Sequence, residues 1–435
     1  MKNITNISKK LKTLNKKLYI VWGFCREKIM WLDNNWGDID LVTDATPDEM
    51  KKVLKIVWDI WKKYWTCIVN EWNQSFEITT FREDIGSINN RKPAEVKFTD
   101  SLEKDSKRRD FTFNSIYFDI DTEIFLDPNW GIKDIKNWVI RFVWDPWDRL
   151  NEDALRFLRF VRLKYKYNLK DASEKYFDLF KQNVHLFKKI PVERLRQEFD
   201  KILLWNNNVE ALQELKDIWF LKIFIPEVNV LNNIPWNKWH LEWDVWMHTK
   251  MCISELNKKV ANLSLWDKII LYYTILLHDI AKSDTLTIDK NGEAHYFNHE
   301  NIWAEIFKDK ISNRLKFTNN HKKEIYWLIK NHIKLFLVPE MKKLKARKFM
   351  MNPLFEKLLI IWDVDNKWRI PVKKWKIEEL VNIYFNFKNI LKDKKFLNWN
   401  DVILKYPELE WRKIWERLTM LNNQILIDDN NKKVK

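Results

Sequence analysis

The chain has 435 residues, of which 46% are hydrophobic and 32% charged, so it is long enough for two or more globular domains. No run of about 18 apolar residues marks a membrane span, and the basic N-terminus lacks the apolar segment of a signal peptide. The net charge of +16 favours a partner that carries phosphates, although abundant Lys, Asn and Ile are also typical of an A/T-rich genome. Three scattered cysteines form no disulfide framework, and we therefore expect a cytoplasmic protein.

Tryptophan and glycine occur in unusual proportions. The chain has 26 Trp and only 5 Gly, whereas average usage predicts roughly 30 Gly in a chain this long. Several Trp stand next to a glycine, where a bulky indole has no evident role: Trp22, Trp36 and Trp130. We hypothesise that most Trp positions represent UGA codons that the source organism reads as glycine, while others, such as Trp246, are genuine.

The first predicted elements are a strand at residues 18–21, a turn at Trp22 and Gly23, and a short helix that carries Arg26. A second predicted strand contains Asp38 and Asp40, which point to the same face because strand side chains alternate. Two adjacent carboxylates repel each other, and a divalent cation is the usual reason to hold such a pair together. The alternative is an exposed edge strand with two solvated aspartates.

The chain then continues with alternating elements. We expect a helix over residues 47–63, with Thr46 as its N-cap, followed by a hairpin of strands at 66–72 and 75–81. Further along, Arg108, Arg109 and Asp110 precede an apolar stretch. Alone, such a triplet is most often a solvated surface segment.

A predicted helix from Glu152 carries four charged residues at a spacing of three, with apolar residues on another face: Asp153, Arg156, Arg159 and Arg162. Cytosine and adenine both present an unprotonated ring nitrogen beside an amino group. A carboxylate that accepts from the amino group and a guanidinium that donates to the ring nitrogen would select C and A against U and G. Asp153 and Arg156 offer this pair, and a solvated basic face is the alternative.

With Trp22 read as glycine, the segments GGxxR, DID, RRDFT and EDxLRxLRxxR together resemble the tRNA nucleotidyltransferase and poly(A) polymerase family, specifically its bacterial CCA-adding type. The resemblance implies that Asp38, Asp40 and Glu77 are catalytic, with Mg²⁺ on the two aspartates. It also implies that Asp110 holds its segment in shape, and that the nucleotide is bound by Trp22, Gly23, Arg26, Arg109, Asp153, Arg156, Arg159 and Arg162.

Residues 165–224 read as amphipathic helices without a catalytic cluster, and Trp219 stands at a helix end where a glycine is expected. Beyond them, the segments DVWMHT, LLHDIAK, YFNHENIWAE and IKNHI resemble the HD superfamily of metal-dependent phosphohydrolases. This implies a divalent metal on His248, His278, Asp279 and Asp365, the last preferred over Asp363 by spacing. His299 and His332 are candidates for a second metal, and an HD core without metal is the alternative.

The predicted fold is α+β, with a small mixed sheet and helices in the head and helices thereafter. We expect a nucleotidyltransferase head at 1–144, a helical neck and body at 145–236, an HD domain at 237–375 and a basic helical region at 376–435. The predicted function is the addition of C and A to tRNA 3′ ends from CTP and ATP. Alternatives are a poly(A) polymerase, an enzyme that adds only CC or only A, and an RNA-binding protein with an inactive head.

Overall fold

The computed structural model describes residues 1–32, 39–59, 66–72, 74–86, 94–231, 244–280, 282–290, 294–367, 374–392, 394, 396–406 and 411–427. It divides into two compact units, Met1–Phe224 and Ile225–Lys435. We describe each unit by itself. Among the described residues, no helix combines the length and the apolar character needed to cross a membrane.

The first unit contains a seven-stranded mixed sheet in the order β3-β4-β5-β2-β1-β8-β9. Only β2 and β5 pair in parallel, while the other neighbouring strands are antiparallel. The strands are β1 (Leu18–Val21), β2 (Leu41–Thr43), β3 (Ile56–Asp59), β4 (Thr66–Glu71), β5 (Gln74–Thr80), β8 (Tyr117–Asp119) and β9 (Phe125–Leu126). A separate hairpin is formed by β6 (Arg82–Ile85) and β7 (Glu95–Phe98). The predicted α+β class with a mixed sheet is therefore confirmed.

Short helices accompany this sheet, and an apolar cluster that includes Tyr19, Val42 and Tyr117 forms part of its core. The helices are α1 (Lys2–Lys12), α2 (Gly23–Ile29), α3 (Pro47–Val53), α5 (Leu102–Lys107), η1 (Thr112–Asn114) and α6 (Gly131–Lys136).

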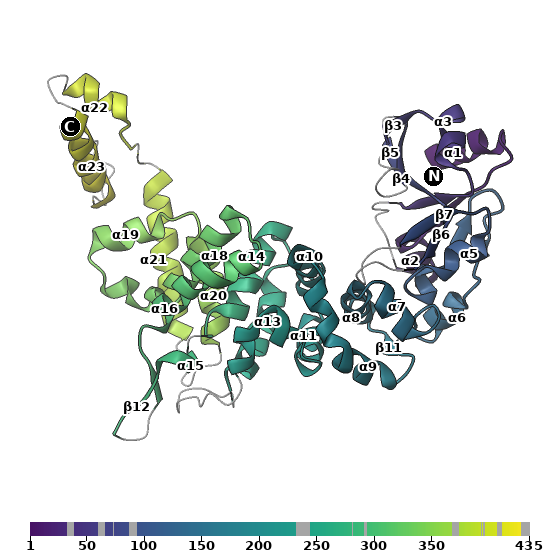
Figure 1. Cartoon of the computed structure of the whole chain (residues 1–435). Helices are drawn as coiled ribbons and strands as arrows, with labels where there is room; N and C mark the ends of the chain where they lie inside the picture. Colours follow the sequence, from purple (N-terminus) through teal and green to yellow (C-terminus); the bar gives the residue numbers. More distant parts are fainter. Residues whose placement is uncertain are drawn as a thin grey trace. The chain divides into compact units, whose positions relative to one another are not determined.

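Helices of the neck follow the head in the same unit (Figure 1). They are α7 (Pro146–Glu152), α8 (Leu155–Tyr167), α9 (Lys175–Asn183), η2 (Val184–Lys189), α10 (Val192–Leu203), α11 (Asn208–Asp217) and α12 (Phe220–Phe224), with a short parallel pair of β10 (Val139–Ile140) and β11 (Lys170–Asp171). Aromatic contacts hold α8 in place. Phe160 stacks on Phe142 with ring centroids 5.4 Å apart, and Phe157 meets Phe180 edge-to-face with centroids 4.3 Å apart.

The second unit is mainly helical, with one hairpin of β12 (Leu286–Ile288) and β13 (Ala294–Tyr296). Its helices are η3 (Pro226–Leu231), α13 (Val245–Lys259), α14 (Leu265–Leu277), α15 (Lys282–Thr285), α16 (His299–Ile306), η4 (Phe307–Ile311), α17 (Ser312–Arg314), α18 (Asn319–Asn331), η5 (Lys334–Glu340), α19 (Lys343–Met350), α20 (Phe355–Asn366), α21 (Lys374–Lys392), α22 (Trp399–Lys405) and α23 (Trp411–Ile427).

Three predicted elements need correction. The helix expected over 47–63 ends at Val53, because the β-branched residues that follow pair with β4 as strand β3, although Thr46 does form the expected cap. Strand β2 begins at Leu41, so Asp40 precedes it rather than lying within it. The helix expected from Glu152 is broken, since α7 ends there and Asp153 adopts an extended conformation before α8.

Tryptophan is the most frequent residue type at backbone positions with positive φ. Of the twelve non-glycine residues with positive φ in the described part of the chain, seven are Trp: Trp22, Trp31, Trp72, Trp130, Trp138, Trp144 and Trp219. All seven are exposed, from 45% for Trp22 to 94% for Trp31. By contrast, Trp246 is 3% exposed on helix α13. Positive φ is the conformation in which glycine has no steric cost and an indole-bearing residue does.

Candidate functional sites

The first candidate site begins at the turn between β1 and α2. Trp22 caps α2 with φ 59° and ψ −116°, a backbone conformation that favours glycine. The Cβ position at Gly23 would lie 3.9 Å from Nη2 of Arg26, so the guanidinium stands beside the turn. A residue without a side chain at position 22 would leave the backbone of this turn open to a ligand.

Carboxylates lie next to this turn on neighbouring strands. The amide of Val21, at the end of β1, donates to the carbonyl oxygen of Asp40 at 3.1 Å. Strands β2 and β5 pair Leu41 with Ile78, so Asp40 and Glu77 immediately precede paired residues. Glu77 is exposed and Asp40 is half-buried. Asp38 lies outside the described residues, so the predicted aspartate pair is described only in part.

Arg26 is a buried cation at the boundary between head and neck. It is 7% exposed, and its Nη1 donates to the side-chain oxygen of Asn114. Its Nη2 donates to the hydroxyl of Tyr167 on α8 at 2.9 Å. Its Nε has no hydrogen-bond partner in the described structure, so the Nε–H of this residue, which is predicted to bind the triphosphate, is free.

Arg109 lies within a buried network. Its Nη2 donates to Oδ2 of Asp105 at 2.9 Å, and its Nε donates to the hydroxyl of Tyr117, also at 2.9 Å. Burial opposes the charged form of Asp105, yet Arg108 and Arg109 hold the pKa of this carboxyl well below its usual range. Arg109 is only 4% exposed, so in this structure it stabilises the head.

Asp110 joins the RRD segment to the neck. Its carboxylate accepts from the amide of Phe111 and from the side chain of Asn114, both at 2.9 Å. Arg159 on α8 approaches the other carboxylate oxygen of Asp110 at 3.7 Å. These contacts are the local hydrogen bonds expected of a residue that holds this segment in shape.

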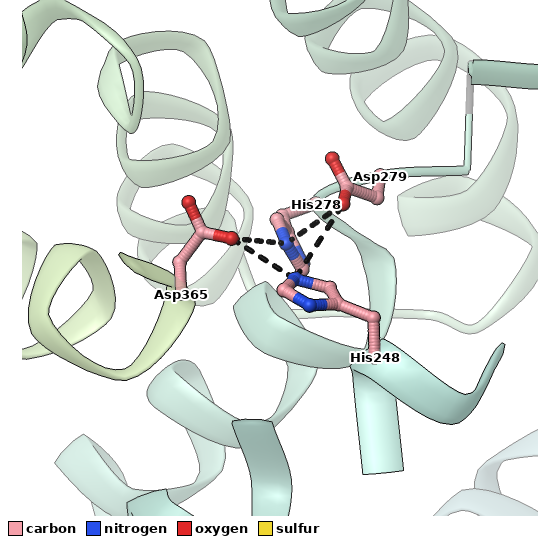
Figure 2. Close-up of side chains that lie close together, drawn as sticks. All are labelled: His248, His278, Asp279 and Asp365. Atoms are coloured by element: carbon pink, nitrogen blue, oxygen red, sulfur yellow. Dashed lines mark hydrogen bonds and ion pairs between the residues drawn. The ribbon is translucent and has the colours of Figure 1, made fainter. Parts of the chain in front are cut away.

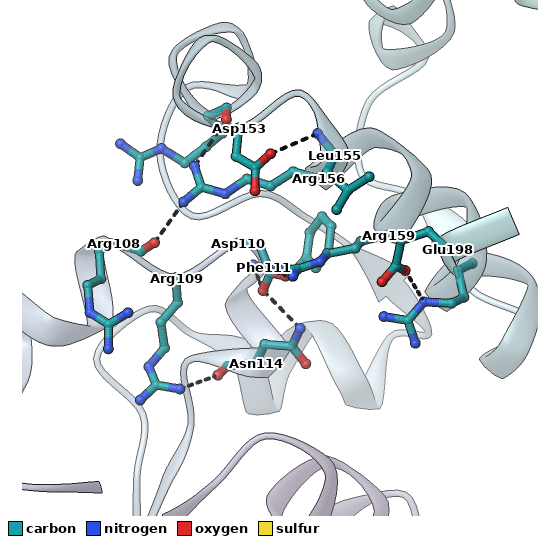
Figure 3. Close-up of polar contacts among 12 residues, drawn as sticks. Arg108, Arg109, Asp110, Phe111, Asn114, Asp153, Leu155, Arg156, Arg159 and Glu198 are labelled. Carbon is teal, nitrogen blue, oxygen red and sulfur yellow. Dashed lines mark hydrogen bonds and ion pairs between the residues drawn. The ribbon is translucent and has the colours of Figure 1, made fainter. Parts of the chain in front are cut away.

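The two residues predicted to read the base have different partners in this structure. Arg156 donates from Nη1 to Oε2 of Glu152 at 2.5 Å. Its Nη2 donates to the carbonyl oxygen of Arg108 at 2.9 Å (Figure 3). Asp153, in the break between α7 and α8, accepts from the amide of Leu155 at 3.1 Å and from Arg194 at 3.4 Å. Both side chains therefore have local partners at the start of α8.

Arg162, the last of the predicted series, faces helix α10. Its Nε donates to Oε2 of Glu198 at 2.8 Å. Burial raises the pKa of Glu198, but the nearby Arg162 and Arg159 more than compensate, so the pKa of Glu198 is lowered overall. Arg162 thus ties α8 to α10.

The second candidate site is a buried group of histidines and aspartates in the second unit. His248 comes from α13, His278 and Asp279 follow α14, and Asp365 comes from α20 (Figure 2). One ligand atom from each of the four residues lies within 4.8 Å of all the others. Nε2 of His248 is 3.0 Å from Oδ1 of Asp365, and Nε2 of His278 is 3.2 Å from Oδ2 of Asp279. The side chains predicted for this site therefore converge.

A second triad shares one residue with the first group. Ligand atoms of Asp279, His299 and His332 also lie within 4.8 Å of one another. Nε2 of His299 is 3.5 Å from Oδ1 of Asp279, whose other oxygen faces His278. Asp279 is thus placed between two groups of candidate ligands.

Backbone carbonyls orient three of these imidazoles. Nδ1 of His278, His299 and His332 lies 2.8, 2.7 and 2.6 Å from the carbonyl oxygen three residues earlier. Metal-ligating histidines use such a bond to fix the ring and present the other nitrogen. Nε2 of His278 and of His299 is buried without a hydrogen-bond partner in the described structure. Imidazole and carboxylate donors in this arrangement fit a divalent metal ion.

Charge also couples the members of this group. Burial opposes protonation of His278, yet Asp279 and Asp365 raise its pKa to about 9. Burial and the neighbouring His278 and His299 lower the pKa of His332 to about 3. Lys282 lies 2.6 Å from Asp279, whereas the alternative ligand Asp363 pairs with Lys259. The structure therefore brings Asp365, and not Asp363, to the histidines.

Sequence reasoning missed two residues of the first site. Glu152 precedes Arg156 by four positions and carries its ion pair, which the helical spacing could have indicated. Tyr167 bonds both Arg26 and Glu27, more than 130 residues away in the chain, and no local pattern marks it.

Comparisons with known proteins fit the head and neck. A family profile described as "Poly A polymerase head domain" matches residues 18–141, and one described as "Probable RNA and SrmB- binding site of polymerase A" matches 173–231. A CCA-adding enzyme of Lactobacillus helveticus is 39% identical over 201 residues, which cover 46% of this chain and 49% of the relative. One of Bacillus subtilis is 38% identical over 197 residues, which cover 45% and 49%. The chain thus spans about half the length of the curated relatives it matches.

Solved structures resemble the whole chain in fold. The CCA-adding enzyme of Bacillus stearothermophilus in complex with CTP aligns with a TM-score of 0.65 at 20% identity, covering 98% of this chain and 92% of that one. The Thermotoga maritima CCA-adding enzyme complexed with tRNA aligns with a TM-score of 0.62 at 18% identity, covering 99% and 92%. The family profiles and the sequence relatives support the predicted family, and the solved structures show a shared fold.

Proposed function

We propose that the chain is a template-independent RNA nucleotidyltransferase that adds C and A to the 3′ end of tRNA from CTP and ATP. The observation that carries this proposal is the strand register that brings Asp40 alongside Glu77, next to a turn whose arginine retains a free donor. The similarity of the head to CCA-adding relatives supports the same activity. The domains are proposed at 1–144, 145–236, 237–375 and 376–435.

Asp38, Asp40 and Glu77 would hold Mg²⁺, which would lower the pKa of the RNA 3′-hydroxyl and neutralise charge on the triphosphate. The protein's own contribution is to bind and orient. The open turn at positions 22 and 23 offers backbone amides to the phosphates, and the free Nε of Arg26 donates to them. Arg109 supports this region from within through Asp105.

Base selection is assigned to the start of α8. Asp153 and Arg156 offer the acceptor and donors that match the shared edge of cytosine and adenine. In this structure Asp153 accepts from a backbone amide and an arginine, and Arg156 donates to a carboxylate and a backbone carbonyl. A bound base would replace these partners. Arg159 and Arg162 belong to the same helix and connect it to Asp110 and Glu198.

The experiment uses a tRNA that lacks its last three nucleotides, incubated with each nucleoside triphosphate singly. The protein with glycine at position 22, as we infer for the native chain, should incorporate CTP at once and ATP after two C residues have been added. Asp40→Ala should reduce incorporation roughly a thousand-fold, because a lost metal ligand removes several kcal/mol of transition-state stabilisation. The matched control is Asp48→Ala, since the Asp48 carboxylate is 90% exposed on α3. Equal activity of Asp40→Ala and Asp48→Ala would contradict the assignment.

We also propose that the second unit is an HD-type centre that holds a divalent metal on His248, His278, Asp279 and Asp365. The metal would supply an activated water for hydrolysis of a phosphoester. Nε2 of His278 and of His299, which are buried without a hydrogen-bond partner in the described structure, support this proposal, and His299 with His332 offers a second position. Metal analysis of purified protein tests it: a stoichiometric divalent ion is expected, and binding by His278→Ala equal to wild type would refute it.

We infer further that the seven Trp with positive φ are glycine positions in the native protein, encoded by UGA. Their backbone conformation and exposure support this reading independently of composition. The gene itself provides the test, because UGG codons at these positions would exclude the idea. Position 22 also separates the proposed enzyme from an RNA-binding protein with an inactive head. A chain with glycine there should add nucleotides, and the chain with tryptophan should not.

A further inference from the structure

We propose that Tyr167 is a positioning residue that couples base reading at the start of α8 to triphosphate placement by Arg26. The inference rests on the nucleotide-addition function proposed above. It assigns a role to a residue that no motif of the sequence marks.

The hydroxyl of Tyr167 lies between two charged groups that follow the β1–α2 turn. It accepts from Nη2 of Arg26 at 2.9 Å and donates to Oε1 of Glu27 at 2.6 Å. The ring of Tyr167 also lies under the guanidinium, with its centroid 4.7 Å from the guanidinium carbon of Arg26. Tyr167 is 6% exposed, so these contacts are shielded from water. One tyrosine therefore fixes both the position and the plane of the guanidinium.

Arg26 is held so that its Nε is left for a ligand. Asn114 and Tyr167 occupy its two terminal nitrogens, while the buried Nε has no partner in the described structure. A buried guanidinium donor without an acceptor is costly, and a phosphate oxygen is the acceptor that the proposed substrate brings. The direction in which this Nε–H points depends on where the Tyr167 hydroxyl holds Nη2 of the same guanidinium.

Helix α8 connects this contact to the base-reading residues. Arg156 is in its first turn and Tyr167 is its last residue. Thirteen residues span about 20 Å of helix axis. The helix is clamped between aromatic side chains, with Phe157 on Phe180 and Phe160 on Phe142, so it moves as one body. A shift that a base imposes on Arg156 therefore reaches Arg26 through Tyr167.

This coupling has a kinetic consequence. A base that fits Asp153 and Arg156 sets α8 so that Arg26 is aligned, whereas a base that does not fit leaves Arg26 misaligned. Part of the discrimination between C or A and U or G then appears in kcat. Removing the Tyr167 hydroxyl should lower kcat for CTP and ATP about tenfold, the value of one hydrogen bond to a charged group. It should lower kcat for UTP and GTP much less. The ratio of kcat for CTP or ATP to kcat for UTP or GTP therefore decreases, while the corresponding ratio of KM values stays the same.

The matched control is Tyr165→Phe. Tyr165 lies on the same helix, and its hydroxyl donates to Glu214 on α11 at 2.6 Å, away from α2. Tyr165→Phe should leave the kcat ratios unchanged. If Tyr167 acts through Arg26, then Tyr167→Phe should add little further loss to Arg26→Lys.

The test is steady-state addition to truncated tRNA by the full chain, with the four nucleoside triphosphates, for wild type, Y167F, Y165F, R26K and R26K/Y167F. Smaller kcat ratios in Y167F alone, with no extra loss in the double variant, are expected. The inference would be overturned if Y167F lost kcat equally for all four nucleotides, or if Y167F behaved like Y165F. It would also be overturned if the losses of R26K and Y167F added up in the double variant. Wild type in this experiment is the chain with glycine at position 22, and its failure to add any nucleotide would instead refute the proposed function.

Discussion

The two candidate centres differ in how their charged groups are held. In the first unit, Arg109 and Arg156 are bound by acids and carbonyls of the chain itself, and Glu77 is exposed. In the second unit, His278 and Asp279 are buried with their partners, and backbone carbonyls orient the imidazoles. The first arrangement suits a site whose charged side chains exchange these partners for the charged groups of a large substrate when it binds. The second suits a site prepared for one small cation.

The largest difference between the centres should appear in His278→Ala. We expect loss of bound metal and of hydrolysis of a model 2′,3′-cyclic phosphate, because an imidazole donor of a buried set is removed. Nucleotide addition should stay near the wild-type rate, since its candidate residues lie in the other unit. His321→Ala is the matched control, as this histidine stacks on Trp266 and is not a member of the ligand groups. Loss of both activities in folded His278→Ala would show that the centres are not separate.

The buried acid of the first unit gives the next largest effect. Asp105→Asn should reduce the free energy of unfolding by about 3–5 kcal/mol, because Arg108 and Arg109 lose their buried counter-charge. Arg108 and Arg109 keep the folded pKa of Asp105 below its unfolded value, so its contribution is present above about pH 4 and is lost as the pH falls. Urea unfolding at pH 7 and at pH 3 measures this.

The difference between Asp105→Asn and wild type should therefore shrink at the lower pH. Asp100→Asn, at an exposed position, should change the stability little at either pH. A difference that is the same at both pH values would show that the Asp105 carboxylate does not stabilise the head by its charge.

Base selection provides a smaller effect. Arg156→Ala should raise misincorporation of UTP and GTP about 10- to 100-fold relative to CTP and ATP, because the donor to the ring nitrogen is lost. Arg162→Ala, farther along α8 and bound to Glu198, should change this ratio less. Unchanged selectivity in Arg156→Ala would mean that the base is read elsewhere.

The smallest expected effect is that of a glycine at Trp130, one of the seven tryptophans with positive φ. Trp130→Gly should raise stability by about 1 kcal/mol, because φ 62° is strained for a side-chain-bearing residue. Trp246→Gly should instead lower stability by about 3–5 kcal/mol, because Trp246 is 3% exposed and its removal leaves a cavity. The same sign of change at both positions would contradict the division of the tryptophans into two classes.

Local sequence signals predicted much of the fold. Strand β1 and the Thr46 cap follow from an apolar run and a capping pattern. The helix expected over 47–63 was wrong at residues 56–59, since pairing of β3 with β4 overrides the helical pattern there, and residues 60–63 lie outside the described residues. The histidines that short motifs single out as candidate ligands do lie together in the fold. The burial of Arg109 and the role of Tyr167 depend on contacts that only the folded chain reveals.

The most direct test of the proposed activity is to sequence the 3′ ends of a tRNA without its last three nucleotides, after incubation with the full chain and all four nucleoside triphosphates. We predict ends that finish in CCA and are not extended further. Asp40→Ala should leave the input ends unchanged, and Asp48→Ala should match wild type. The account would be contradicted by ends that carry long runs of A, or by ends that carry only CC or a single A. It would also be contradicted if the chain with glycine at position 22 left the tRNA unaltered.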